Sequence, residues 1–248
     1  MLTKSVISCL LLAAFFNATA THSEPSSTAP RATHDVPKEP ADARAILMEM
    51  RDFLHNAADL EFDTSFSISG IGQGTSHYRI RQPNLFHVEI ESKNKAYTFI
   101  SDGKALIIHR PKGRRFAQIP ARDSIVGTMY AATGILAAQA RVLDFFWTVD
   151  YASISGGEVR FSATQAATVG NRKCNGFIVE RFEDKWEVWL ETSGVPLPCK
   201  LVSRRRDGSS LTVQSNQFKW ITAPKLSSET FEFTPPPNST RVDISDVK

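Results

Sequence analysis

The sequence predicts a mainly β domain with some α-helix: an open, unclosed antiparallel β-barrel of about ten or eleven strands. Short segments of alternating apolar and polar residues recur along most of the chain, a pattern typical of half-buried strands. Turn sequences such as Asp102-Gly103 separate these segments. Strands and helices do not alternate regularly, which argues against a doubly wound parallel sheet. Two segments with helical periodicity lie before and within the strands, and we expect the sheet to wrap around them.

The N-terminus carries the features of an export signal. Lys4 precedes an apolar run at residues 6–16 that is too short to span a bilayer comfortably. Ala18 and Ala20 then occupy the small-residue positions of a cleavage site. We therefore expect residues 1–20 to be a signal peptide, cleaved after Ala20, and the mature protein to be periplasmic.

Residues 21–40 are rich in Ser, Thr and Pro without apolar periodicity, so we expect a flexible lead there. Cys9 lies inside the apolar run rather than at its end, which argues against a lipid anchor. Residues 41–248 are long enough for a single β-rich domain with a substantial core. The formal net charge of +3 is too weakly basic to indicate a nucleic-acid partner.

The first element after this lead is an amphipathic helix over residues 42–58. Pro40 stands near its first turn and Asp42 is able to cap it. Apolar residues follow at the spacing of one helical face, namely Ile46, Leu47, Met50, Phe53, Leu54 and Ala57. Such a face has to pack against another apolar surface.

A meander of antiparallel strands comes next. The expected strands are residues 62–68, 76–82, 86–91, 96–101, 104–110 and 114–120. The glycine-rich run at 70–74 predicts a flexible turn or bulge between the first two. Asp102-Gly103 is one of the strongest short hairpin signals and joins the fourth strand to the fifth.

Residues 121–147 interrupt the meander because they are rich in Ala and carry apolar residues at helical spacing. We expect one or two helices there, weakened by Gly127 and Gly134. Strand patterns then return at residues 157–169, 174–182, 185–192, 199–206 and 210–221. A proline-rich tail at 231–244 ends the domain.

The sequence offers no catalytic constellation. Ser101-x-x-Lys104 matches the nucleophile signature of penicillin-binding enzymes by letter only, because it lies between two strands rather than at the start of a helix. The glycines at 70–74 join two strands, so no helix N-terminus is available there for a phosphate. The histidines in strands have no spacing that brings them together. We therefore expect a protein that is not an enzyme and has no cofactor or metal.

Cys174 and Cys199 remain once the leader is removed, and we expect them to form a disulfide because the exported compartment permits it. The bond would close a loop of about 25 residues and contribute roughly 3–4 kcal/mol. The alternative is a metal site, but further His or Cys ligands at a suitable spacing are lacking.

Basic residues gather in two runs. One consists of Arg110, Lys112, Arg114 and Arg115, here called the basic rim, and the other of three arginines at 204–206. Such residues usually form a solvated edge that discourages strand aggregation. The functional alternative is a rim that binds a partner. That partner would be either the anionic lipid headgroups of a membrane, contacted peripherally, or an acidic protein.

The chain also has a surplus of apolar residues, with Phe as the dominant aromatic residue. In a curved sheet these residues either fill the core or together line a cavity for an acyl chain or a lipidated peptide. The pattern leaves both possibilities open.

Several segments resemble the LolA/LolB-like periplasmic lipoprotein-carrier fold. They read YRIRQPNLFHVEI, FISDGKALIIHRP, the Ala-rich insertion and WEVWLETSGVPLPCKLVSRRRDG. TVGNRKCNGFIVE, followed by WEVWLETSGVPLPCKLV and the closing ETFEFTPPPNSTRV, is most similar to the exported proteins grouped as DUF2092. The resemblance covers about residues 42–244. It implies an unclosed antiparallel barrel with helices on its concave side, an apolar cavity between them, and a carrier or sensor of lipid-bearing molecules.

Two functions remain as hypotheses. The first is a non-enzymatic binding protein for a lipid, an acyl chain or a lipoprotein. Its cavity would be lined from the sheet by Phe66, Ile68, Phe86, Val88, Ile90, Phe99, Leu106 and Ile108, and from the N-terminal helix by Leu47, Met50, Phe53 and Leu54. The second is a regulatory or scaffolding module that binds another envelope protein through an exposed apolar patch or a sheet edge.

Overall fold

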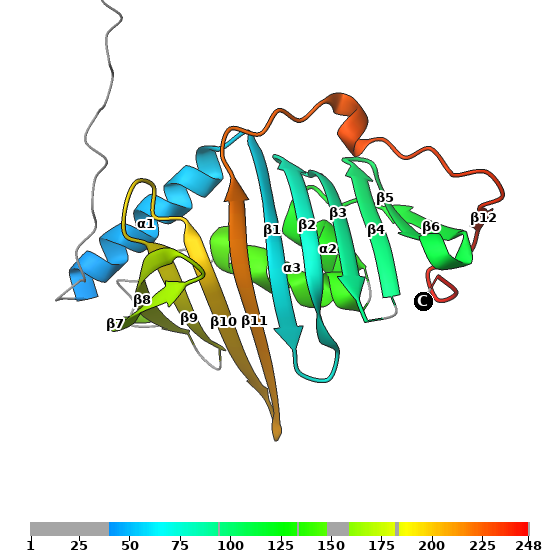
Figure 1. The fold of residues 1–248 in the computed structure, drawn as a ribbon. Helices are drawn as coiled ribbons and strands as arrows, with labels where there is room; N and C mark the ends of the chain where they lie inside the picture. Colours follow the sequence, from blue (N-terminus) through cyan, green and yellow to red (C-terminus); the bar gives the residue numbers. More distant parts are fainter. Residues whose placement is uncertain (1–39, 94, 133, 148–158, 182–183, 248) are drawn as a thin grey trace, which may run out of the picture. The chain divides into compact units, whose positions relative to one another are not determined.

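In the part of the chain that the structure describes, twelve strands form one sheet, and every neighbouring pair is antiparallel except the pair at one edge (Figure 1). The computed structural model describes residues 40–93, 95–132, 134–147, 159–181 and 184–247, all within one compact unit. The expected signal peptide and most of the expected flexible lead lie outside the described residues.

The strand order is β12-β6-β5-β4-β3-β2-β1-β11-β10-β9-β8-β7. The strands are β1 (Asp59–Ile68), β2 (Gly72–Arg81), β3 (Leu85–Ser92), β4 (Lys95–Asp102), β5 (Ala105–Arg110), β6 (Arg115–Pro120), β7 (Val159–Val169), β8 (Arg172–Arg181), β9 (Asp184–Glu191), β10 (Pro198–Asp207), β11 (Ser210–Ile221) and β12 (Thr240–Arg241). Because β12 and β7 are the two edges among the described strands, hydrogen bonds between these strands do not close the sheet. This confirms the predicted open antiparallel architecture, to which the structure adds the short parallel strand β12.

Among the described residues, three α-helices accompany the sheet: α1 (Pro40–Asn56), α2 (Ile125–Ala131) and α3 (Ile135–Trp147). Figure 1 shows α2 and α3 lying against one face of the sheet. Ser124 caps α2, because its Oγ accepts a hydrogen bond of 3.1 Å from the backbone N–H of Gly127. Among the described residues, no helix combines the length and the apolar character needed to cross a membrane.

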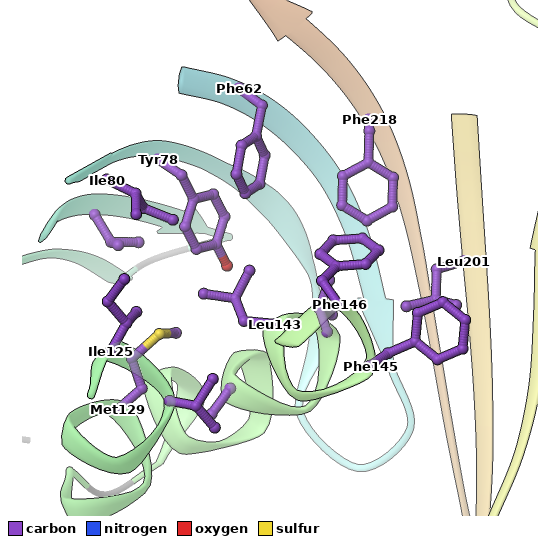
Figure 2. Close-up of a cluster of buried hydrophobic side chains, with 14 of the residues drawn as sticks. Phe62, Tyr78, Ile80, Ile125, Met129, Leu143, Phe145, Phe146, Leu201 and Phe218 are labelled. Atoms are coloured by element: carbon purple, nitrogen blue, oxygen red, sulfur yellow. The ribbon is translucent and has the colours of Figure 1, made fainter. Parts of the chain in front are cut away.

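One hydrophobic core joins the helices to the inner face of the sheet. Ala43, Leu47, Met50 and Leu54 form the buried face of α1. The helical spacing predicted the last three, whereas Phe53, which it also placed on this face, is 41% exposed. Figure 2 shows the centre of the core, where aromatic side chains of β1, β2 and β11 point toward α3. The apolar surplus of the sequence is therefore used largely in packing.

The glycine-rich run at 70–74 is only partly a turn. Gly70 has a φ of +76° and belongs to the turn, whereas β2 already begins at Gly72. Within that strand, a Cβ atom on Gly74 would lie 2.0 Å from the carbonyl oxygen of Glu91 and 2.8 Å from Cζ of Phe66. A glycine is needed at 74 because β2 approaches both β3 and the Phe66 ring too closely for any side chain.

We expect Gly74→Ala to lower the free energy of unfolding by about 1–3 kcal/mol, since the backbone has to shift to admit the methyl group. Gly113→Ala is the matched control, because the atom nearest to its added methyl group would be 3.8 Å away. Chemical denaturation of both variants and the original protein measures the difference. Equal losses for the two variants would contradict the close approach at Gly74.

Residues 222–247 are here called the C-terminal strap. The strap leaves β11, runs along the ends of the strands β1, β2, β3, β4 and β5, and reaches β6 (Figure 1). Arg81 donates to the carbonyl oxygen of Leu226 at 2.6 Å, and the Nδ1–H of His87 donates to that of Thr230 at 2.9 Å. Burial lowers the pKa of His87, which favours its neutral form beside the strap. Near its end, Val247 is buried in the core. The strap is therefore part of the folded domain and not a free tail.

Candidate functional site

A pocket of about 460 Å³ lies at the end of the sheet where β1 turns into β2 and β3 turns into β4. Its volume is within the range of roughly 300–1,000 Å³ that is typical of small-ligand sites. The lining residues are Gly70, Ile71, Ser92, Lys93, Lys95, Tyr97, Phe99, Ile108, Gly134, Ile135 and Val247. The pocket is thus built from the β-meander, the α2–α3 junction and the C-terminal strap.

Most of the pocket wall is apolar. Tyr97 and Phe99 alternate onto the same face of β4, and their ring centroids are 5.8 Å apart. Ile108 of β5 stands directly opposite Phe99 in the antiparallel register. The α2–α3 junction brings Ile135 to the pocket, and Gly134 makes this turn with a φ of +70°, a conformation that favours glycine. Such a surface suits the apolar part of a ligand.

The mouth of the pocket is basic. Lys93 and Lys95 line it from the β3–β4 turn, and both are exposed. The same two lysines also line an adjoining shallow hollow, to which Lys112 of the basic rim contributes. The sequence analysis missed Lys93 and Lys95, although the run Ser-Lys-Asn-Lys between two predicted strands was an available signal.

The other members of the basic rim lie at the same connection between β5 and β6 as Lys112. Arg114 and Arg115 line a separate hollow against the C-terminal strap, where Arg115 donates to the carbonyl oxygen of Asp246 at 3.3 Å. Arg110 is the last residue of β5. Lys112 therefore lines the same hollow as Lys93 and Lys95, whereas Arg114 and Arg115 line the hollow against the strap.

The twelve residues proposed from the sequence as cavity lining occupy three kinds of position. Phe99 and Ile108 line the pocket. Phe53 is 41% exposed and lies beside a shallow groove that also contacts Val195. The others are buried in the core, namely Leu47, Met50, Leu54, Phe66, Ile68, Phe86, Val88, Ile90 and Leu106. Tyr97, Ile135 and Val247 are pocket residues that the sequence analysis did not single out.

Ser101 and Lys104 belong to the β4–β5 hairpin. The Ser101 hydroxyl donates to the carbonyl oxygen of Asn84 at 2.9 Å and accepts from the Gly103 N–H at 3.3 Å. The Asp102 carboxylate accepts from the backbone N–H of Lys104 at 2.8 Å. These bonds give the polar groups of the turn a structural role. Within the part of the chain that the structure describes, no cluster of His, Cys, Asp or Glu residues is arranged to hold a metal ion.

Cys174 and Cys199 form the predicted disulfide, with their Cα atoms 6.6 Å apart. The bond joins β8 to β10 although β9 lies between these strands. Cys174 pairs with Glu191 at the end of β9, and Cys199 lies at a shift in the β9–β10 register. The disulfide therefore passes over the end of β9, on the other half of the sheet from the pocket.

Fold and site together define a β-rich domain: an open antiparallel sheet backed by helices, with an apolar pocket that two exposed lysines help to line. The chain belongs to the DUF2092 family, described as predicted periplasmic proteins, whose family model matches residues 43–245. This confirms the family resemblance found in the sequence and the periplasmic localisation. A search of curated protein sequences found no significant match.

Three solved structures with low sequence identity are among those similar to this chain. An uncharacterized conserved protein from Thermus thermophilus is 10% identical, with a TM-score of 0.47 over 81% of this chain and 98% of that one. MucB is 13% identical, with a TM-score of 0.46 over 78% of this chain and 63% of its own. A LolA superfamily protein from Nitrosomonas europaea is 8% identical, with a TM-score of 0.37 over 77% of this chain and 97% of that one.

Proposed function

We propose that this protein is a non-enzymatic periplasmic binding protein that holds a hydrophobic ligand, such as the acyl chain of a lipid or a lipoprotein. The observation that carries the proposal is the pocket of about 460 Å³ with apolar walls from β4, β5 and the start of α3. Apolar pockets with a few polar groups at one side are the usual form of small-ligand sites.

The energetics of burial support an acyl chain as the occupant. Each methylene group removed from water contributes about 0.8 kcal/mol, so ten methylenes contribute roughly 8 kcal/mol before the cost of association. The rings of Tyr97 and Phe99 and the side chains of Ile108 and Ile135 offer contacts of this kind. The ligand needs no reactive group in the pocket, consistent with the structural role of the Ser101 hydroxyl.

We expect the purified protein to take up a fluorescent fatty acid, and we expect Ile135→Trp to weaken that uptake at least about tenfold. Ile135 is only half-buried, so the indole can enter the pocket without displacing the core. A tenfold change corresponds to about 1.4 kcal/mol, less than the contribution of two buried methylenes. Fluorescence titration gives the affinity, and native mass spectrometry shows any lipid that copurifies.

The matched control is Leu211→Trp, since Leu211 is 50% exposed on β11 and does not line the pocket. This variant should bind as the original protein does. Unchanged uptake by Ile135→Trp would overturn the placement of the ligand in this pocket. A lipid-free protein that takes up no fatty acid and cross-links to one dominant envelope protein would instead support the scaffolding alternative, for which the exposed Phe53 groove is the candidate surface.

A further inference from the structure

Three lysines from separate parts of the chain line the pocket or the hollow that adjoins it. Lys93 and Lys95 flank the β3–β4 turn, and Lys112 belongs to the short 3-10 helix η1 (Pro111–Gly113) between β5 and β6. Lys93 and Lys95 line the apolar pocket and also the adjoining hollow of about 520 Å³, to which Lys112 contributes. We call these three residues the lysine cluster.

The lysine cluster is short of negative partners. None of its three members forms an ion pair with a carboxylate of the described residues. Glu91 is the single acidic residue that lines the adjoining hollow, and the apolar pocket has no acidic lining residue among those described. The mouth therefore keeps an excess of positive charge, whereas many other charged residues of the sheet are paired, for example Arg81 with Asp59 at 2.7 Å.

The position of the cluster distinguishes it from an ordinary solvated edge. Turn lysines often serve only to keep a sheet soluble. Here Lys93 and Lys95 border the apolar wall formed by Tyr97 and Phe99, so one molecule can contact both surfaces. A lysine can lay its methylene stem on apolar surface and keep its ammonium group in water, which is the arrangement that an amphiphile needs at its headgroup.

We propose that the ligand of this pocket is a single amphiphile with an anionic headgroup, carboxylate or phosphate, and that Lys93, Lys95 and Lys112 bind that headgroup at the mouth. The inference rests on the proposed function and specifies the chemical class of the ligand. The acyl chain lies in the apolar pocket, and the headgroup accepts charge-assisted hydrogen bonds from the ammonium groups.

Calorimetric titration with dodecanoate, dodecyl phosphate and dodecan-1-ol tests the proposal. These probes share a chain and differ in headgroup charge. We expect the two anions to bind about tenfold more tightly than the alcohol, a difference of the size that a few partly exposed charge contacts provide. Added salt should reduce that difference, because the cluster is solvent-exposed.

The triple variant Lys93→Gln, Lys95→Gln, Lys112→Gln should bind all three probes with the affinity of the alcohol. The matched control, Lys173→Gln, Lys219→Gln, Lys225→Gln, removes the same charge from positions outside the pocket and should keep the preference for anions. If the two triple variants have equal thermal stability, then impaired folding is not the reason why only the first loses the preference for anions.

The outcomes separate this inference from the proposed function. If the original protein binds none of the probes, both fail. If it binds all three equally, or if the cluster variant keeps the preference for anions, only the headgroup inference is overturned. The inference also fails if inorganic phosphate binds as tightly as dodecyl phosphate. It fails likewise if the lysines are needed for binding to anionic phospholipid vesicles but not to dodecanoate, which would indicate docking on a membrane.

Discussion

Replacing Phe62 with alanine should lower the free energy of unfolding by about 3–5 kcal/mol, the usual range for a buried Phe→Ala change. The ring is fully buried, and Figure 2 shows it near the rings of Tyr78 and Phe218. Its centroid is 4.6 Å from that of Tyr78, 4.5 Å from that of Trp220 and 6.0 Å from that of Phe218. Because these partners lie on both neighbouring strands, the cavity left by the ring cannot collapse without moving β2 or β11.

Denaturation by urea, monitored by tryptophan fluorescence and by circular dichroism, measures this loss. Phe53→Ala is the matched control, because Phe53 is 41% exposed and the same truncation there should cost less than about 1 kcal/mol. Phe62→Leu should recover part of the stability, since it keeps most of the apolar volume. Similar losses at positions 62 and 53 would show that the aromatic cluster contributes no special stability.

Removing the disulfide should lower the free energy of unfolding by about 3–4 kcal/mol, the loop-closure contribution expected for a sequence separation of 25 residues. The bond ties β8 to β10 across the end of β9, so its loss frees strands that are not hydrogen-bonded to each other. Val169 and Trp189 pack against the two buried cysteines. A change to alanine is therefore preferable to serine, because it leaves no buried hydroxyl group without a partner.

The measurement compares the oxidised protein, the same protein reduced with dithiothreitol, and the variant Cys174→Ala, Cys199→Ala. The reduced protein and the variant should have similar midpoints of urea denaturation, both below that of the oxidised protein. A variant as stable as the oxidised protein would contradict a stabilising role for the bond. Retained fatty-acid uptake by the variant under folding conditions is also expected, since neither cysteine lines the pocket.

Local patterns in the sequence predicted most of the strands because burial alternates along several of them, such as β1, β3 and β9. In β3, Phe86, Val88 and Ile90 are buried, as their alternation with polar residues predicts. The β4–β5 hairpin forms at the predicted dipeptide, where Gly103 has a φ of +85°. The disulfide was predictable because only two cysteines remain beyond the leader.

The pocket could not be predicted in the same way, since its walls come from segments far apart in the chain. Val247 reaches it only because the C-terminal strap pairs with β6 through the two residues of β12, too short a strand for any periodicity. The buried face of β11 was also hard to identify from the sequence, because Gln214 and Asn216 are buried there although both are polar. Gln214 donates to the Oε1 of Gln139 on α3 at 3.2 Å, a contact between residues 75 positions apart.

The pairing of β1 with β11 has a consequence for how the chain folds. Most neighbouring strands in the sheet are consecutive in the sequence and can form by local hairpins, but Phe62 pairs with Trp220. Closing such a long loop costs entropy before the contact is gained, and folding rates fall as contacts become less local. The pairing of β1 with β11 therefore cannot be completed until the chain as far as residue 221 is available to fold. We expect the formation of this pair to limit the folding rate.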